Sequence, residues 1–341
     1  MSTLKVATWN IQAIRGASDE RLAAIAAALA EHRPDVVLLQ EVSSRAATFD
    51  RLARFLAERG LPYSHFGGQD ADRIVRRDRR KRYGNTIASR WPLAPATWEP
   101  APPWPQLIAA ADVEVPGHRV RVVAVHAPNA AGNGWDKVRT LEALRAGLLQ
   151  EAGPCVVAGD LNEPRAFTPG PLSFRARADG STDGDWTDRF GETHPRSRWQ
   201  AAVTGVLGED APVSLATTLA GVEPQPTHVV RAGEPRFFDH VLVAPPVSVE
   251  DLTYDHEIRL GPEPLSDHSI VVASLALPGV ASARSDCVGA VDTPYGRIVW
   301  RDGPLTDGTR ITLERDGEAA RDLLLGSLIG HTNGAVLRFL P

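Results

Sequence analysis

The sequence has very little cysteine and no long apolar run. Its 341 residues contain two cysteines, Cys155 and Cys287, and Cys155 opens an apolar run that we expect to be buried. Such a chain does not belong to the small, disulfide-rich secreted class. No apolar run approaches the ~20 residues of a membrane-spanning helix. The first residues lead directly into a predicted strand without the pattern of a signal peptide, so we expect a cytoplasmic protein.

Charge is ordinary in amount but uneven in position. The formal net charge is −5, and 43% of the residues are hydrophobic, as in soluble globular proteins generally. Residues 73–82, however, hold seven basic residues and one acidic residue. Such a run is more often a solvated loop, but it can also steer a polyanion towards one part of the surface. The candidates for nucleic-acid contact are Arg76, Arg77, Arg79, Arg80, Lys81 and Arg82.

Short Val, Ile and Leu runs alternate with segments of helical periodicity. Helices are predicted over 19–32, 44–59 and 135–150, and a hairpin over 107–115 and 119–125. Ser18 is the expected N-cap of the first helix. Residues 163–235 are rich in Gly, Pro, Asp and Arg, which predicts a long loop-dominated stretch. Strand pairs and helices without a continuous βαβ repeat favour an α/β sandwich of two mixed sheets over a parallel barrel.

The pattern of residue types along the chain changes near residue 278. Closely spaced Asp-Gly and Pro-containing turns then separate short strand-like pieces. We therefore expect a main domain over 1–278 and a small β-rich appendage over 283–341, in which we find no catalytic pattern.

Several predicted strands of the main domain end in polar residues of the kinds that act on phosphate. These residues are Asn10, Glu41, His126, Asp160, Asn162, Asp239, Asp267 and His268. A lone Asn or Glu at a strand end is more often a cap or a turn residue, whereas Gly159-Asp160-Leu-Asn162 is about as often a turn, and a histidine such as His126 about as often a satisfied core residue, as a functional one. Their joint occurrence, each at the end of an element, is hard to obtain from caps and turns. The set therefore predicts a metal-assisted phosphoryl site.

The chemistry of phosphodiester cleavage explains these residue types. The charge on the phosphate oxygens must be neutralised, a water made nucleophilic and the leaving oxygen stabilised. Glu41 is a natural ligand for Mg²⁺, which takes one or two carboxylates and keeps several waters, and Asn10 can support the metal or a phosphate. Asp160 can orient and deprotonate water, while Asn162 donates to the phosphate.

Two histidines complete the predicted site. His126 and His268 can donate hydrogen bonds to phosphate oxygens when they are protonated. A carboxylate partner favours the charged imidazole, and Asp239 is the candidate for His268. Asp267 can supply a second metal ligand.

Other histidines are interpreted as structural. His240 should face the opposite way from Asp239 along its strand. His194, His228 and His256 lie in loop-like sequence and carry no pattern of their own.

Taken together, these motifs resemble the endonuclease/exonuclease/phosphatase superfamily, which includes DNase I-like nucleases, abasic-site endonucleases, neutral sphingomyelinases, deadenylases and inositol-polyphosphate 5-phosphatases. The matching segments are Thr8-Trp9-Asn10, Leu39-Gln40-Glu41, Gly84-Asn85, His126-Ala-Pro-Asn129, Gly159-Asp160-Leu-Asn162, Phe238-Asp239 and Ser266-Asp267-His268. The resemblance covers residues 4–277 and has no counterpart for the appendage.

The resemblance implies a four-layer α/β sandwich, with two packed mixed sheets flanked by helices and the site at one edge of the sheets. It also implies Mg²⁺ or Mn²⁺ as cofactor. By motif, the resemblance implies that Glu41, Asn10 and Asp267 hold the metal and that Asp160 activates water. It implies that Asn162 binds the phosphate and that His268, supported by Asp239, contacts it. His126 is similar to the histidine of the DNase-like and sphingomyelinase-like branches.

Three functions remain open from the sequence. The first is a nuclease in which the basic run grips the nucleic-acid backbone. The second is a hydrolase of lipid or small phosphate esters, for which the Trp- and Pro-rich segment 98–105 is a candidate membrane loop. A packed, polyproline-like connector is the plainer interpretation of that segment. The third is a catalytically silent binding protein, against which the complete set of catalytic residue types argues.

Overall fold

The computed structural model describes residues 2–12, 18–43, 46–67, 83–167, 170–229 and 234–278, and the backbone of five strands between 289 and 339. The chain divides into two compact units, 1–279 and 280–341. No helix in the described part of the chain is long and apolar enough to cross a membrane. The first unit holds all the predicted site residues.

The first sheet of this unit has six strands in the order β15-β16-β1-β2-β4-β3. Their bounds are Ser248–Asp255, Ile270–Ala276, Thr3–Asn10, Val36–Ser43, Tyr83–Ser89 and Tyr63–Phe66. Strands β1 and β2 run parallel, and the other neighbours are antiparallel. Central strands are buried on both faces, which is why they consist of almost continuous Val and Leu.

The second sheet also has six strands, in the order β11-β14-β8-β7-β6-β5. Their bounds are Ser214–Leu215, Asp239–Val243, Cys155–Asp160, His118–His126, Ile108–Val115 and Leu93–Ala96. Strands β7 and β8 are the parallel pair here, and β6 and β7 form the predicted hairpin. Each sheet therefore carries one parallel pair at its centre, and the carboxyl ends of such a pair lie at one edge.

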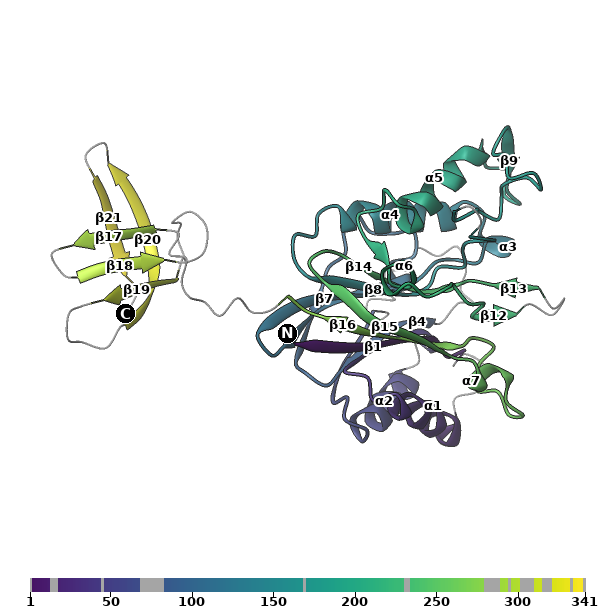
Figure 1. Cartoon of the computed structure of the whole chain (residues 1–341), viewed down its shortest axis with the longest axis horizontal. Helices are drawn as coiled ribbons and strands as arrows, with labels where there is room; N and C mark the ends of the chain where they lie inside the picture. The colour runs from purple at the N-terminus through teal and green to yellow at the C-terminus, as the bar shows by residue number, and fades with distance from the viewer. Residues whose placement is uncertain are drawn as a thin grey trace. The chain divides into compact units, whose positions relative to one another are not determined.

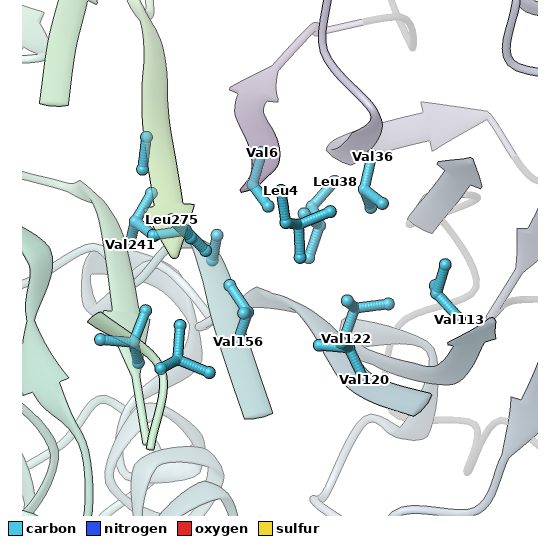
Figure 2. Close-up of a cluster of buried hydrophobic side chains, with 14 of the residues drawn as sticks. Leu4, Val6, Val36, Leu38, Val113, Val120, Val122, Val156, Val241 and Leu275 are labelled. Carbon is cyan, nitrogen blue, oxygen red and sulfur yellow. The ribbon is translucent and has the colours of Figure 1, made fainter. Parts of the chain in front are cut away.

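The two sheets pack face to face through an apolar core. Figure 2 shows side chains from both sheets meeting in this layer, among them Leu4, Val6, Val36, Leu38, Val113, Val120, Val122 and Val156. Fully burying a Val or Leu side chain contributes about 1.5–3 kcal/mol relative to leaving it exposed. This shared core fixes how the two sheets lie against each other.

Helices cover the outer faces of both sheets (Figure 1). Helices α1, Asp19–Glu31, and α2, Ala46–Ala57, pack on the first sheet, whereas α4, Asp136–Leu148, and α5, Arg196–Leu207, pack on the second. The Ser18 hydroxyl caps α1 by accepting a hydrogen bond from the amide of Arg21. The layers follow the order helix, sheet, sheet, helix, which confirms the predicted four-layer sandwich.

Shorter elements connect these layers. They are α3 (Ala130–Asn133), α6 (Ala216–Ala220), α7 (Glu257–Leu260), η3 (Pro105–Leu107), and the two-stranded pairs β9 (Asp185–Thr187) with β10 (Thr193–Pro195) and β12 (His228–Val229) with β13 (Pro235–Arg236).

The prediction that 163–235 is dominated by loops was wrong for α5. Trp199, Val203 and Val206 lie at helical spacing on its buried face. The helix begins directly after Pro195 and packs closely on α4, where Gly205 meets the side chain of Arg145. Surrounding Gly, Pro and Asp residues concealed this short apolar stripe in the sequence.

The Trp- and Pro-rich segment 98–105 is packed on the body. Trp98 is 6% exposed, and its indole N–H donates to the carbonyl of Ala143 in α4 at 3.3 Å. The indole N–H of Trp104 donates to the carboxylate of Asp136. These contacts match the connector interpretation of the segment rather than an exposed membrane loop.

The second unit is a five-stranded antiparallel sheet in the order β17-β18-β19-β20-β21. The strand bounds are Gly289–Thr293, Gly296–Trp300, Arg310–Glu314, Arg321–His331 and Gly334–Phe339.

Gly159 allows β7 and β8 to approach closely beside the site. Its φ is 152°, and a Cβ placed there would lie 1.8 Å from the carbonyl oxygen of Val125 in β7. No other residue type fits this position without moving the backbone, and Asp160 is the next residue.

We expect Gly159→Ala to lower the free energy of unfolding by about 3 kcal/mol or more, because the added methyl overlaps backbone that has no room to move. Urea unfolding measures the change. Gly153→Ala is the matched control, since a Cβ there meets open space, and it should change stability by no more than about 0.5 kcal/mol. Equal effects of the two substitutions would contradict the described packing.

Candidate active site

A cleft of about 420 Å³ opens at the edge where β1, β2, β7 and β8 end. Seven of the eight predicted site residues line it: Asn10, Glu41, His126, Asp160, Asn162, Asp267 and His268. The eighth, Asp239, lies behind His268. The remaining lining residues are Gln12, Tyr83, Asn129, Lys137, Phe174, Arg175, His228, Arg236 and Phe238.

Asp160 lies at the centre of the polar groups. Its Oδ2 accepts a hydrogen bond from Asn10 Nδ2 at 3.0 Å, and its Oδ1 accepts from the amide of Asn162 at 2.8 Å. The Nε2 atoms of His126 and His268 lie 3.6 and 3.7 Å from Oδ2. The carboxylate is 2% exposed, so this side chain is fixed by neighbours from three other segments of the chain.

Asn162 has a left-handed backbone conformation next to a buried ion pair. Its φ is 50°, in the region that asparagine adopts more readily than most residues other than glycine. The ammonium group of Lys137 donates to its carbonyl at 2.6 Å and to Glu163 Oε1 at 3.2 Å. Burial lowers the pKa of Lys137, and the charge of Glu163 opposes that shift. Asn162 Nδ2 in turn donates to the carbonyl of Ala127.

The Glu163 side chain accepts the hydrogen bonds that connect Asn162 and its neighbours to α4 and α5. Its carboxylate accepts from Lys137, from the indole of Trp199 in α5 at 2.7 Å and from the amide of Phe174 at 3.2 Å. Its carbonyl lies 2.8 Å from His240 Nε2. Burial lowers the pKa of His240, which therefore acts as a neutral structural residue, as its place along the strand predicts.

His268 and Asp239 form a buried ion pair. His268 Nδ1 lies 2.8 Å from Asp239 Oδ2. Burial opposes a charged imidazole, but the carboxylates of Asp239, Asp160 and Asp267 outweigh it and raise the pKa of His268 to about 10. Burial likewise opposes ionisation of Asp239, but His268 and the Thr227 hydroxyl lower its pKa. His268 is thus an imidazolium at neutral pH.

His228 belongs to the site, which corrects its interpretation as a structural loop residue. Its Nε2 lies 3.4 Å from Asp267 Oδ2, and its ring stacks on Phe238 and contacts His268. Burial opposes ionisation of Asp267, but its hydrogen bond with His228 and the charges of both histidines lower its pKa to about 2. Gln12 Nε2 also donates to this carboxylate. The sequence carried no motif around His228, because its two-residue strand pairs with the equally short β13 and reaches the site through an isolated antiparallel bridge to His268, far away in the chain.

Glu41 occupies a bulge in β2. The pairing of β2 with β4 shifts between Leu39 and Val42, and Glu41 has a φ of 58°. A bulge re-aims the side chain of the extra residue, and the Glu41 side chain lines the cleft. Left-handed backbone in a non-glycine residue costs energy and is concentrated at functional sites.

The lining residues fit a hard divalent cation. Glu41, Asp267 and the amide oxygen of Asn10 are oxygen donors, and Mg²⁺ needs only one or two carboxylates in addition to waters. The tightest groups of possible ligands in the described chain are different ones: His228–Asp267–His268 and Asp160–Asp239–His268. Both include His268, whose protonated ring has no lone pair to give. The Glu41 side therefore suits a cation better than either tight cluster.

Sequence reasoning missed the basic and aromatic wall of the cleft. This wall consists of Lys137, Phe174, Arg175, Arg236 and Phe238. Lys137 lies on the core face of a predicted helix, and Phe174, Arg175 and Arg236 lie in or beside irregular chain, so no strand end marked them. Phe238 precedes Asp239 in one of the matching segments, but the resemblance assigned no role to it. The predicted nucleic-acid-binding run, Arg76 to Arg82, lies outside the described residues.

The chain is similar to several solved structures, although no curated protein matches it in sequence. Among solved structures, an endonuclease/exonuclease/phosphatase from Beutenbergia cavernae is 22% identical with a TM-score of 0.55, over 97% of this chain and 83% of that one. An AP endonuclease from Archaeoglobus fulgidus is 19% identical with a TM-score of 0.57, over 80% of this chain and 100% of that one. D. rerio TDP2, complexed with a single-strand DNA product, is 17% identical with a TM-score of 0.55, over 81% and 100%.

These likenesses show the shared fold. The sequence model of the Endonuclease/Exonuclease/phosphatase family matches residues 7–268, from the first strand to the histidine that Asp239 supports. That span contains the whole cleft. The chain therefore belongs to the endonuclease/exonuclease/phosphatase family, whose members are hydrolases of phosphodiesters and phosphate esters.

Proposed function

We propose that the protein is a divalent-metal-dependent phosphodiester hydrolase, and specifically a nuclease that cleaves DNA or RNA by attack of water on phosphorus. The observation that carries the proposal is the environment of Asp160. This buried carboxylate lies between His126 and His268, accepts from Asn10 and from the amide of Asn162, and shares its cleft with Glu41.

Each group has a task in this reaction. A divalent ion at Glu41 and Asn10, with Asp267 as a further ligand, supplies Lewis-acid neutralisation of the phosphate charge. Asp160 orients a water and accepts its proton, since its two oxygens are fixed by neighbours and its Oδ2 has capacity for one further donor. Asn10 and the Asn162 amide hold that carboxylate in place.

The imidazoles provide the complementary positive charge. His268 presents a protonated Nε2 to the cleft while its Nδ1 is held by Asp239, so it can donate to a phosphate oxygen whose charge grows during attack. His126 reaches the same region from β7. Asp239 is a positioning residue, because it acts on the substrate only through His268.

Nucleic acid is the substrate that the cleft supports best. Phe174 offers an aromatic ring against which a base or sugar can pack, and Lys137, Arg175 and Arg236 add positive charge beside it. The fold resembles that of TDP2, which was solved with a DNA product. The basic run before β4 adds a further candidate for backbone contact.

The alternatives have less support. A lipid-acting enzyme needs an apolar loop free to enter a membrane surface, but Trp98 of the candidate segment is buried against α4. A silent binding protein does not require a carboxylate fixed between two histidines. Small soluble phosphate esters remain the second candidate, because the cleft is open to them.

Asp160→Asn should lower kcat for a phosphodiester such as bis-p-nitrophenyl phosphate by about 100-fold or more, since an amide cannot accept the proton from water. His268→Gln should cause a similar loss. Asp112→Asn is the control, because Asp112 is also a buried carboxylate of the second sheet but pairs with Arg119 and Arg121 away from the cleft. Near-wild-type turnover by either site variant would break the assignment.

The pH profile of kcat/KM should end in an alkaline limb near pH 10, where His268 loses its proton. Asp239→Asn removes the charge that raises the pKa of His268, so the limb should move to lower pH. The same pair stabilises the fold fully below about pH 6.5, the unfolded pKa of histidine, and this contribution is lost as pH rises through about 10. An unmoved limb in the variant would show that Asp239 does not control His268.

Replacing Arg76, Arg77, Arg79 and Arg80 by Gln should weaken nucleic-acid binding and flatten its salt dependence, because each lost phosphate contact reduces the log–log slope by about 0.9. Fluorescence anisotropy at several salt concentrations measures both. The control removes the same charge from four exposed arginines of the body, Arg33, Arg54, Arg59 and Arg119. Equal slopes in the two variants would exclude a specific role for the run.

A further inference from the structure

Arg175 is a cation in the cleft that forms no ion pair within the described residues. It lines the cleft together with Asp160 and His268. Its guanidinium forms no hydrogen bond with any residue in the described ranges either, and its Nε is buried without a hydrogen-bond partner. Its backbone carbonyl accepts a hydrogen bond from Arg196 at 2.7 Å.

Two tryptophans contact the guanidinium of Arg175. The guanidinium carbon lies 4.2 Å from the ring centroid of Trp186 in β9 and 5.5 Å from that of Trp199 in α5. The two indoles pack edge to face with centroids 5.3 Å apart. Cation–π contacts of this kind restrict where a guanidinium can lie and use none of its N–H donors. The guanidinium of Arg175 is thus held in place without a hydrogen bond in the described residues.

The other cations of this wall already have carboxylate partners. Lys137 pairs with Glu163 at 3.2 Å, and Arg236 pairs with Glu234. Burial lowers the pKa of the Arg175 guanidinium, and the charge of Glu163, which Lys137 already binds, opposes that shift. A half-buried charge without an ion pair of its own is costly to the fold. An anion that arrives with the substrate removes that cost.

The reacting phosphate does not account for this cation. Its charge is already met by the imidazolium of His268 and by the proposed metal residues at the ends of β1 and β2. Arg175 instead lies in the segment that follows β8, next to Phe174, whose ring contacts the charged groups of Arg236 and Lys137 at 5.0 and 5.5 Å. The cleft therefore has an aromatic ring and a free guanidinium beyond what one phosphate needs.

We propose that Arg175 binds a second phosphate group of the substrate, next to the one that is hydrolysed. The inference rests on the proposed function and narrows its substrate class to compounds with at least two phosphates. A nucleic-acid strand supplies such a group as its next phosphodiester, and the adjoining Phe174 ring fits the nucleoside between. An inositol polyphosphate supplies the same chemistry without a base, whereas a lipid with a single phosphodiester does not.

Isothermal titration in Mg²⁺ with thymidine 5′-monophosphate and thymidine 3′,5′-bisphosphate tests the proposal. The wild-type protein should bind the bisphosphate at least about tenfold more tightly, the size of one charge-assisted contact. Arg175→Gln should bind both ligands equally, and Arg175→Lys should retain part of the preference. Arg177→Gln, at an exposed position in the same segment, should behave as wild type.

Equal affinity of the wild-type protein for the two ligands, or an unchanged preference in Arg175→Gln, would overturn the proposal. Thermal unfolding identifies any variant that fails to fold. If Arg175→Gln is one of these, the preference of Arg175→Lys for the bisphosphate is compared with that of the wild-type protein instead. Inositol 1,4-bisphosphate separates the two sources: a gain only with the thymidine ligand supports a nucleic-acid strand, and an equal gain supports recognition of paired phosphates alone. Hydrolysis of the 5′-phosphorylated dinucleotide pdTpdT, which carries two phosphates, is assayed in parallel, because its absence would contradict the proposed function without changing the binding preference.

Discussion

A hydrogen bond of 3.0 Å from Asn10 to Asp160 joins the two sheets at the edge where the cleft opens. Asn10 ends β1 in one sheet and Asp160 ends β8 in the other, and the apolar layer between the sheets sets the distance between them. The rest of the site depends on this alignment. A shift of either sheet would separate the proposed metal residues at the ends of β1 and β2 from the carboxylate proposed to activate water, so the hydrophobic core also determines the geometry of the site.

Alternating charge is the second organising feature. Asp239, His268 and Asp160 follow one another as carboxylate, imidazolium and carboxylate, and the ring of His126 also lies near the Asp160 carboxylate. Each charge is buried, so each is tolerated only because its neighbours have the opposite sign. A substrate phosphate and a divalent ion extend this alternation into the cleft. Arg175 is the one cation of the described cleft that stands outside it, which is why it points to a second phosphate.

The sandwich and seven of the cleft residues could be predicted from the sequence, because both predictions depend on regular strands. Apolar runs mark the strands, and the polar residue that ends each one is visible in the chain. The basic wall could not be predicted in this way. The role proposed for Arg175 depends on its contacts with Trp186 and Trp199. These tryptophans belong to a small hairpin and to a helix that Gly and Pro residues conceal in the sequence. The bulge that turns Glu41 into the cleft also depends on the register of a neighbouring strand, which no local pattern encodes.

The central claim is that this cleft uses water to attack phosphorus with the help of a divalent ion. Cleavage of the 5′-phosphorylated dinucleotide pdTpdT in ¹⁸O-labelled water, with Mg²⁺ or Mn²⁺ and in parallel with a chelator, tests it most directly by mass spectrometry of the products. The account predicts one ¹⁸O atom in the phosphate of the released nucleotide and no cleavage in the chelator. Label in the sugar hydroxyl, or equal cleavage without metal, would contradict it.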